Sequence, residues 1–314
     1  LPGTIDPKLY PSLGFYQAGI DAPALPPAGT SFLQAIISSC TECVAANKDK
    51  IEVSRDKLEA YLLDMDWERF KRIESYTNTW VRALPLKFSN QLSEANFIIL
   101  RDLLQLGSGY RNELKASNGG RRGAFETILY GCMSMYLAGN AMDATSYEKV
   151  SLESISEHFQ IPMMGMEEPI QAEREDGTKV EFASAITISR PSVLRRLVEQ
   201  ITVLVQDTGR RLRELGYKSM AHFVIDQLER QQDGPSAGAL VEAFACNFPA
   251  FQDVGEVGGR PVYLFKKAQL VVYDLWLRFG EEDPKRFGFK DIGEFTIFAD
   301  NVIPTMQIHH GLIR

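Results

Sequence analysis

An acidic residue stands inside an apolar stretch near the C-terminal end of the chain. Asp300 follows Ile297-Phe298-Ala299 and precedes Val302-Ile303-Pro304. If this stretch is buried, the carboxylate loses hydration and is stable only where it is paired or used. An aspartate in such a setting is therefore a candidate functional residue. The structural alternative is that Asp300 is the N-cap of a final helix that starts near Ile303, with Pro304 at its first position.

Four polar or aromatic residues follow one another at helical spacing upstream of Asp300. Lys266, Gln269, Tyr273 and Trp276 follow one another at spacings of three, four and three residues, so a helix would place them in one stripe. This spacing is compatible with a functional face and also with a solvated amphipathic face.

Other common chemistries have little support. Cys40 and Cys43 have the spacing of redox and zinc sites, but no second Cys or His pair lies at zinc-finger distance. The same spacing places both thiols on one face of a helix, so we interpret them as packed free thiols. The chain has no Walker loop, dinucleotide glycine pattern or nucleophile elbow. We therefore expect neither a metal site nor a bound cofactor.

Composition restricts the partners. The chain has 314 residues, of which 45% are hydrophobic and 24% charged, as in an ordinary globular protein. Its net charge of −7 disfavours binding to a long nucleic acid or to anionic lipid. The longest apolar run, from Ile128 to Ala138, is too short for a bilayer span, and no signal peptide is visible. The four scattered cysteines favour a reducing compartment, so we expect a cytoplasmic location and no membrane association. The oligomeric state cannot be derived.

The periodicity predicts a mainly α fold: a single large helical domain with one or two small β-hairpins. The first helix is expected to start at about Ser31, with Thr30 or Ser31 as its N-cap. A helix that starts at Leu194 is expected to have an end marked by Gly209 and Gly216, and one that starts at Ser151 is expected to end near Pro162. The other expected helices are Ser54 to Leu63, Asp66 to Phe70, Glu94 to Leu106, Phe125 to Leu137, Met220 to Leu228 and Phe265 to Phe279. Hairpins are expected around Asp176-Gly177 and within residues 253–263.

Four regions follow from this interpretation. A proline-rich arm covers residues 1–30, a helical region 31–162, an acidic connector 163–184, and a second helical region 185–314 that carries the polar motifs. Two glycine-rich segments interrupt the first helical region. Gly107 to Arg111 is a candidate ligand surface, and Gly119 to Gly123 is a flexible cationic turn.

Three blocks carry a family resemblance: FPAFQD (248–253), VYLFKKAQLVVYDLW (262–276) and FKDIGEFTIFADNVIP (289–304). In order and spacing they resemble the queuosine salvage family, the queuosine 5′-monophosphate N-glycosylases that release queuine. Weaker similarity extends upstream, so the resemblance covers roughly residues 90–314.

The resemblance implies a helical fold distantly similar to DNA glycosylases and hydrolysis of the bond between a 7-deazaguanine nitrogen and ribose C1′. The family's catalytic aspartate falls on Asp300, its motif lysine on Lys266, and its motif phenylalanine on Phe298, which would contact the base. We expect Asn301, Lys267, Asp102, Ser108 and Tyr110 to contact the substrate as well. The implied partner is a small nucleotide.

The chain departs from the family in one segment. Where members carry Asn-Phe-Ser-Phe-Trp, this chain has Gln105-Leu106-Gly107-Ser108-Gly109, and a following Tyr-Trp pair is absent around Ile128-Leu129. Loss of these aromatic walls leaves a second function open: a catalytically silent or re-purposed paralogue that binds another small ligand or a protein.

Overall fold

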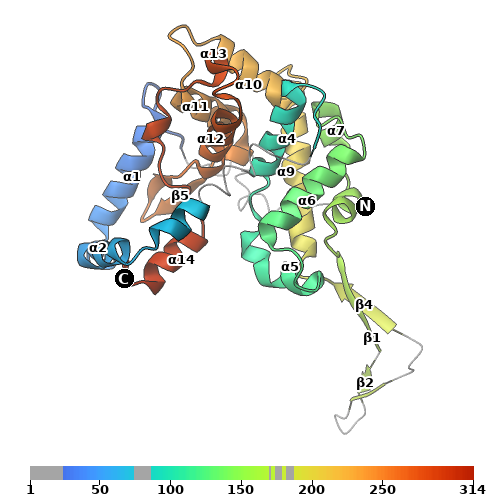
Figure 1. The fold of residues 1–314 in the computed structure, drawn as a ribbon. Helices are drawn as coiled ribbons and strands as arrows, with labels where there is room; N and C mark the ends of the chain where they lie inside the picture. Colours follow the sequence, from blue (N-terminus) through green and yellow to red (C-terminus); the bar gives the residue numbers. More distant parts are fainter. Residues whose placement is uncertain (1–23, 74–85, 170, 174–178, 182–186) are drawn as a thin grey trace.

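The computed structural model describes residues 24–73, 86–169, 171–173, 179–181 and 187–314. Figure 1 shows a mainly α-helical body from which one β-ribbon projects, so the predicted fold class is confirmed. The α-helices are α1 (Phe32–Ala46), α2 (Arg55–Leu63), α4 (Gln91–Leu103), α5 (Arg111–Ser117), α6 (Ala124–Leu137), α7 (Ala144–Glu148), α8 (Leu152–Phe159), α9 (Arg195–Glu214), α10 (Met220–Glu229), α11 (Ala237–Asn247), α12 (Lys266–Phe279), α13 (Pro284–Phe287) and α14 (Val302–His309). Short 3₁₀ helices are η3 (Gly107–Tyr110), η4 (Pro249–Phe251) and η5 (Ile292–Glu294), and residues 67–73 are also helical.

Side-chain caps begin many of these helices, because a short polar side chain satisfies an amide that has no partner in the first turn. Ser31, Ser54 and Ser151 accept from the amides of Gln34, Lys57 and Ser154, which confirms the predicted starts of α1, α2 and α8. The predicted start of α4 at Glu94 is wrong by one turn. Asn90 caps this helix by accepting from the Ser93 amide at 2.8 Å, so the helix begins at Gln91.

Helix α4 forms the centre of the core. It packs against α12, α10 and α6, and nine consecutive residues, Ala95 to Leu103, are buried. Its buried polar residues, described below, therefore lie in a low-dielectric environment.

Helix α9 continues through Gly209, which corrects the prediction that this glycine marks the end of the helix. A Cβ atom at Gly209 would lie 2.7 Å from the Ala144 carbonyl oxygen and 2.8 Å from the Glu148 amide of α7. The glycine therefore permits close packing of α7 on α9. The helix ends at Glu214, and Gly216 takes the left-handed conformation, with φ +81°, just beyond it.

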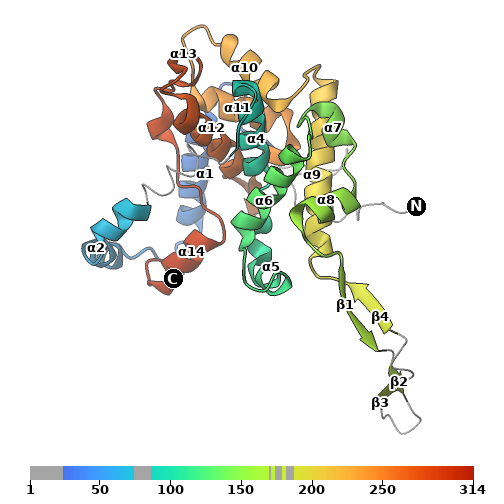
Figure 2. The same ribbon diagram turned by 45° about the vertical axis from the view of Figure 1, so that its right-hand side comes forward.

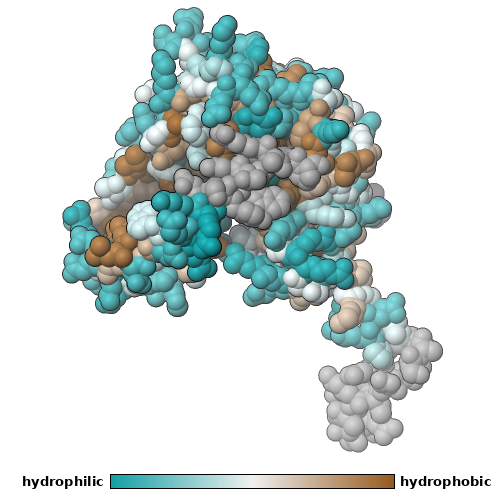
Figure 3. Space-filling view, viewed as in Figure 1, coloured by the Kyte–Doolittle hydropathy of each residue, from teal (hydrophilic) through white to brown (hydrophobic). Residues whose placement is uncertain are grey.

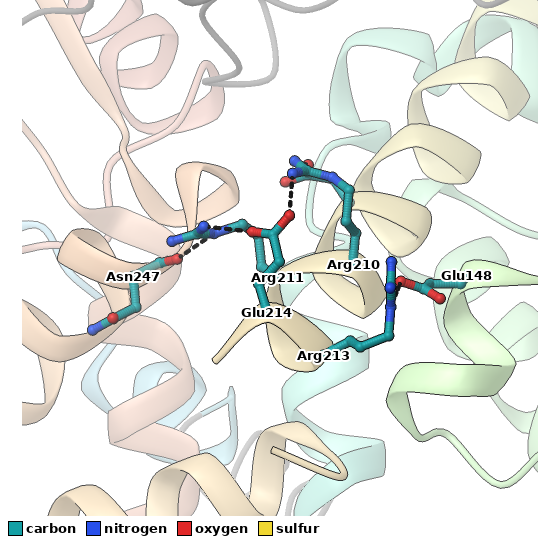
Figure 4. A network of polar contacts seen from close by, with 7 residues as sticks. Glu148, Arg210, Arg211, Arg213, Glu214 and Asn247 are labelled. Carbon is teal, nitrogen blue, oxygen red and sulfur yellow. Dashed lines mark hydrogen bonds and ion pairs between the residues drawn. The ribbon is translucent and has the colours of Figure 1, made fainter. Parts of the chain in front are cut away.

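A polar network fixes the C-terminal end of α9 (Figure 4). Arg211 donates to the Asn247 carbonyl oxygen of α11 at 3.1 Å and pairs with Glu214 at 2.7 Å. Arg213 pairs with Glu148 of α7 at 2.7 Å. These contacts join α9 to α11 through a hydrogen bond and to α7 through an ion pair.

The described strands form two hairpins, as predicted. Strands β1 (Met164–Pro169) and β4 (Thr187–Pro191) pair antiparallel, and β2 (Gln171–Glu173) and β3 (Lys179–Glu181) continue the same ribbon, which projects from the body in Figures 1 and 2. The expected Asp176-Gly177 turn lies outside the described residues. The second hairpin pairs β5 (Val254–Val257) with β6 (Arg260–Tyr263).

Most of the predicted proline-rich arm, residues 1–23, lies outside the described residues. The part that is described is anchored, because the Tyr263 hydroxyl donates to the Ala24 carbonyl oxygen at 2.9 Å. The face in Figure 3 is largely hydrophilic, with apolar side chains gathered at the corner where α2 lies. Within the described residues, no helix is long and apolar enough to cross a membrane.

Candidate active site

Lys266 and Asp300 face each other although 34 residues separate them in the chain. Lys266 is the first residue of α12, and Asp300 lies two residues before α14. The lysine Nζ is 3.4 Å from Asp300 Oδ2, and their side chains are 17% and 33% exposed. The structure therefore brings together the two residues predicted to be catalytic.

Asp300 also has a structural contact. Its Oδ1 accepts from the Val302 amide at 2.9 Å, close to the capping role considered from the sequence. The formal N-cap is Asn301, the helix starts at Val302, and Pro304 is its third residue, so the predicted start near Ile303 was displaced by one residue. Because Oδ1 accepts from this amide, Oδ2 is the oxygen that faces Lys266, and both residues line the cavity described below.

Helix α12 positions the segment that precedes Asp300. The Gln269 side chain, fully buried, donates to Thr296 Oγ1 and accepts from the Thr296 amide, each at 3.0 Å. One turn further on, the Tyr273 ring packs edge-on against Phe298 with centroids 5.5 Å apart. The stripe predicted along α12 is therefore an interior contact surface and not a solvated face.

Strained backbone precedes Lys266. Phe265 is a buried, non-glycine residue with φ 44° and ψ 36°, the left-handed region that L-residues rarely adopt. Its ring lies between those of Phe32 and Tyr263, with centroid distances of 5.0 and 5.6 Å. The Asp253 carbonyl oxygen accepts from the Phe265 amide at 3.2 Å. The surrounding contacts thus hold a costly conformation that turns the chain into α12.

A buried charge cluster lies behind the pair. Arg101 and Asp102 of α4 form a two-point ion pair, with distances of 2.7 and 3.1 Å, and Arg101 also pairs with Asp274 of α12. Burial raises the pKa of Asp102, against the attraction of Arg101. Burial and then the charge of Asp102 raise the pKa of Asp274 well above its usual value. The raised pKa favours the protonated form of Asp274, in which Arg101 balances Asp102 alone.

A cavity of about 510 Å³ opens beside Lys266 and Asp300. Its other walls come from the end of α4, η3, α5, the following turn and the start of α6: Gln105, Gly107, Ser108, Arg111, Lys115, Gly120, Arg121, Gly123, Ala124, Phe125, Glu126 and Ile128. An adjoining cavity of about 390 Å³ shares Ser108 and Arg111 and reaches Asn301. Figures 1 and 2 show α5 and α14 on opposite sides of this region.

The remaining predicted site residues differ in position. Ser108 lines the main cavity and Asn301 the adjoining one. Lys267 is turned away from the cavity to Asp253, at 3.4 Å, and Asp102 is buried against Arg101. Tyr110 donates to Gln200 at 3.0 Å, and Phe298 packs on Tyr273, so neither of these rings lines the cavity.

The sequence predicted no individual role for four residues of the cavity wall, although Arg111 ends the segment 107–111 that was expected as a ligand surface. Arg111, Lys115 and Arg121 provide positive charge, and Phe125 presents a ring that is 45% exposed. The cationic turn from Gly119 to Gly123 was the available signal for Arg121. Segment 107–111, expected as a glycine loop, folds as η3 and the start of α5, which gives Arg111 and Lys115 a common helix face.

A helical fold with a concave, charged site of this size is typical of proteins that bind or transform small ligands. Residues 140–314, more than half of the chain, match the family described as queuosine salvage protein, and the chain belongs to this family.

Several relatives carry the name queuosine 5′-phosphate N-glycosylase/hydrolase. The Sphaerobacter thermophilus protein is 41% identical over 81 residues, which cover 26% of this chain and 24% of that protein. The Mus musculus protein is 30% identical over 119 residues, covering 38% and 32%. The Nematostella vectensis protein is 31% identical over 140 residues, covering 44% and 36%. The matched segments thus span about a quarter to a third of these relatives.

Proposed function

We propose that this protein is an N-glycosylase that hydrolyses the N-ribosidic bond of queuosine 5′-phosphate, or of a related 7-deazaguanine nucleotide, and releases the base. The observation that carries the proposal is the Lys266–Asp300 pair at the wall of an open cavity. Family membership and the names of the relatives support the choice of substrate.

The chemistry requires a negative charge near ribose C1′. As the bond from C1′ to the base nitrogen breaks, positive charge develops on the ribose, and the Asp300 carboxylate would stabilise it or attack it. Water then supplies the oxygen that bonds to C1′, and its proton ends on the base nitrogen. Lys266 would orient Asp300, because its Nζ lies 3.4 Å from Asp300 Oδ2.

The cavity also has an aromatic surface for the base. Phe125 lines the cavity with a partly exposed ring, and stacking of a base on such a ring contributes about 1 to 3 kcal/mol. We propose that Phe125 replaces part of the aromatic surface that segment 105–109 lacks. The cavity favours this function over a silent paralogue, for which a closed site would be expected.

The division of the chain follows from the same site. We propose that the region 31–162 supplies the wall formed by η3, α5 and α6, and that the region 185–314 supplies Lys266 and Asp300. The residues 163–184 would act as the connector. We also propose a cytoplasmic location, because all four cysteines are free thiols.

Release of queuine tests the function. The purified protein is incubated with queuosine 5′-phosphate, and the products are separated by chromatography. We expect queuine to appear in proportion to the enzyme concentration. If a folded protein releases no base from this nucleotide or from other 7-deazaguanine nucleotides, the assignment is wrong.

A further inference from the structure

A separate cavity lies at the other end of α4 from the Lys266–Asp300 pair. It has a volume of about 660 Å³, and its walls come from the start of α4, the end of α6, the turn into α7 and the start of α10. Within the described residues, it shares no lining residue with the two cavities described above. Figures 1 and 2 show α7 and α10 toward the top of the body, and α5 and α14 toward the bottom.

A buried asparagine lines this cavity with an unengaged donor. Asn96 of α4 is only 7% exposed. The Ala221 amide donates to Asn96 Oδ1 at 2.8 Å, and because an amide N–H can only donate, Nδ2 is the other branch of this side chain. No group in the described part of the chain accepts from Nδ2. By contrast, the side-chain nitrogens of Asn47, Asn118 and Asn247 all donate to backbone carbonyls. A buried donor without an acceptor is unfavourable, so Asn96 requires an acceptor atom in the cavity.

The potential at this wall favours an acceptor with negative charge. The N-cap residues of α4 and α10, Asn90 and Ser219, both line the cavity, and these helices have 13 and 10 residues. A helix N-terminus carries a partial positive charge that stabilises anions. Lys218, directly before Ser219, adds a full charge, and no carboxylate of the described ranges pairs with it. The acceptor that fits Asn96 is therefore an anion.

The other charges of the lining limit this anion to a single negative charge. Asp143, the N-cap of α7, also lines the cavity, and its Oδ1 accepts from the Ser146 amide at 2.8 Å. Counted with His222 neutral, the lining has no net charge, because Lys218 balances Asp143. A carboxylate brings one negative charge, whereas a phosphomonoester brings about 1.5 to 2 at pH 7. Repulsion by Asp143 therefore disfavours the phosphomonoester more strongly.

An apolar wall completes the cavity. It consists of Leu92 of α4, Leu137 at the end of α6, and Met142 in the turn that precedes α7. Leu137 is 70% exposed in the protein, so an aliphatic group that covers it removes apolar surface from water. The cavity thus matches a ligand that has both a single negative charge and an aliphatic part.

We propose that this cavity binds a small monocarboxylate with an aliphatic chain. The carboxylate accepts from Asn96 Nδ2 and pairs with Lys218, and the chain packs against the apolar wall. This inference goes beyond the proposed function and does not depend on it, because it uses no residue of the cavity beside Lys266 and Asp300.

Calorimetry with isocaproate tests the class of ligand. Isocaproamide is the matched control ligand, because it has the same aliphatic chain and no charge. We expect isocaproate to bind the wild-type protein at least tenfold more tightly than isocaproamide or inorganic phosphate. Absence of isocaproate binding, equal binding of isocaproamide, or tighter binding of phosphate would overturn the proposal.

Substitutions in the cavity locate the bound carboxylate. Asn96→Asp keeps an oxygen for the Ala221 amide but replaces the donor with a second oxygen, and Lys218→Gln removes the positive charge. Each change should weaken isocaproate binding at least tenfold. Lys149→Gln changes an exposed lysine at the end of α7, outside the cavity, and this control should bind like the wild type. Because Lys218 is exposed, Lys218→Gln should fold and decides the question if Asn96→Asp does not fold.

Arg121→Gln examines the alternative location. Arg121 lines the cationic cavity beside Lys266 and Asp300, which can also attract a carboxylate. We expect Arg121→Gln to bind isocaproate as the wild type does. If Arg121→Gln loses binding while Asn96→Asp and Lys218→Gln keep it, the carboxylate binds in the other cavity and the proposal is wrong.

Discussion

Gln269 and Thr296 hydrogen-bond in both directions, although 27 residues separate them. The Gln269 amide donates to the Thr296 hydroxyl and accepts from the Thr296 backbone amide, each at 3.0 Å. Gln269 also donates to the Leu264 carbonyl oxygen at 3.0 Å. One buried side chain therefore ties the start of α12 to the segment that leads to Asp300, and we expect it to help set the distance between Lys266 and Asp300.

Gln269→Leu should consequently lower both stability and turnover. The leucine leaves the Thr296 amide and the Leu264 carbonyl without their partners, and each part-buried hydrogen bond that is lost costs about 0.5 to 1.5 kcal/mol. Urea unfolding and base release measure the two effects. Gln206→Leu is the matched control, because it removes a similar bond, to the Val150 carbonyl at 2.7 Å, away from the cavity. Full turnover in a destabilised Gln269→Leu variant would show that this contact does not position Asp300.

Asp300→Asn separates catalysis from capping. Asparagine can still accept from the Val302 amide, so the free energy of unfolding should change by about 1 kcal/mol or less. It loses the negative charge, so turnover should fall at least about a hundredfold, or roughly 2.7 kcal/mol of barrier. The control is Asp143→Asn, which changes a capping carboxylate of α7 that accepts from the Ser146 amide at 2.8 Å. A variant that melts and turns over like the wild type would exclude Asp300 as the catalytic carboxylate.

Local rules predicted the starts of α1, α2 and α8, because capping depends on a few neighbouring residues such as Ser31 and Ser54. The family motif, and not geometry, predicted that Asp300 and Lys266 belong to the site. Local rules did not place Lys115 or Phe125, because these lie at the cavity only when α5 and α6 meet the C-terminal region. The positions of Lys267 and Tyr110 could not be predicted either, since Asp253 and Gln200, their partners, lie 14 and 90 residues away.

Gly209→Ala should destabilise the protein in spite of the higher helix propensity of alanine. In an open helix this change would stabilise by about 1 kcal/mol. Here the new Cβ meets α7 backbone atoms at 2.7 and 2.8 Å, so we expect a net loss of about 1 to 3 kcal/mol in the free energy of unfolding. Chemical denaturation measures it. Gly255→Ala, where no atom lies within 4 Å of the new Cβ, is the control, and equal stability of both variants would refute close packing at Gly209.

The buried cluster of Arg101, Asp102 and Asp274 predicts an unusual pH dependence. The pKa of Asp274 is raised in the folded protein, so the folded state holds a proton that the unfolded chain releases above its ordinary pKa of 3.8. The stability from this group is therefore complete below that pH and is lost as the pH rises through the folded pKa. An asparagine in place of Asp274 would imitate the protonated acid, since its amide can donate to Asp102 and accept from Arg101.

We therefore expect Asp274→Asn to gain stability relative to the wild type as the pH rises, by up to about 1.4 kcal/mol per pH unit within that window. Urea unfolding at a series of pH values from acid to neutral measures the difference. Asp226→Asn is the control of opposite sign. The Tyr217 hydroxyl donates to Asp226 and lowers the pKa of that carboxyl. The stability that the Asp226 carboxylate contributes is therefore present at higher pH and is lost as the pH falls. The Asp226→Asn variant should accordingly lose stability relative to the wild type as the pH rises. A constant difference between Asp274→Asn and the wild type at every pH would mean that Asp274 titrates alike in the folded and unfolded chains.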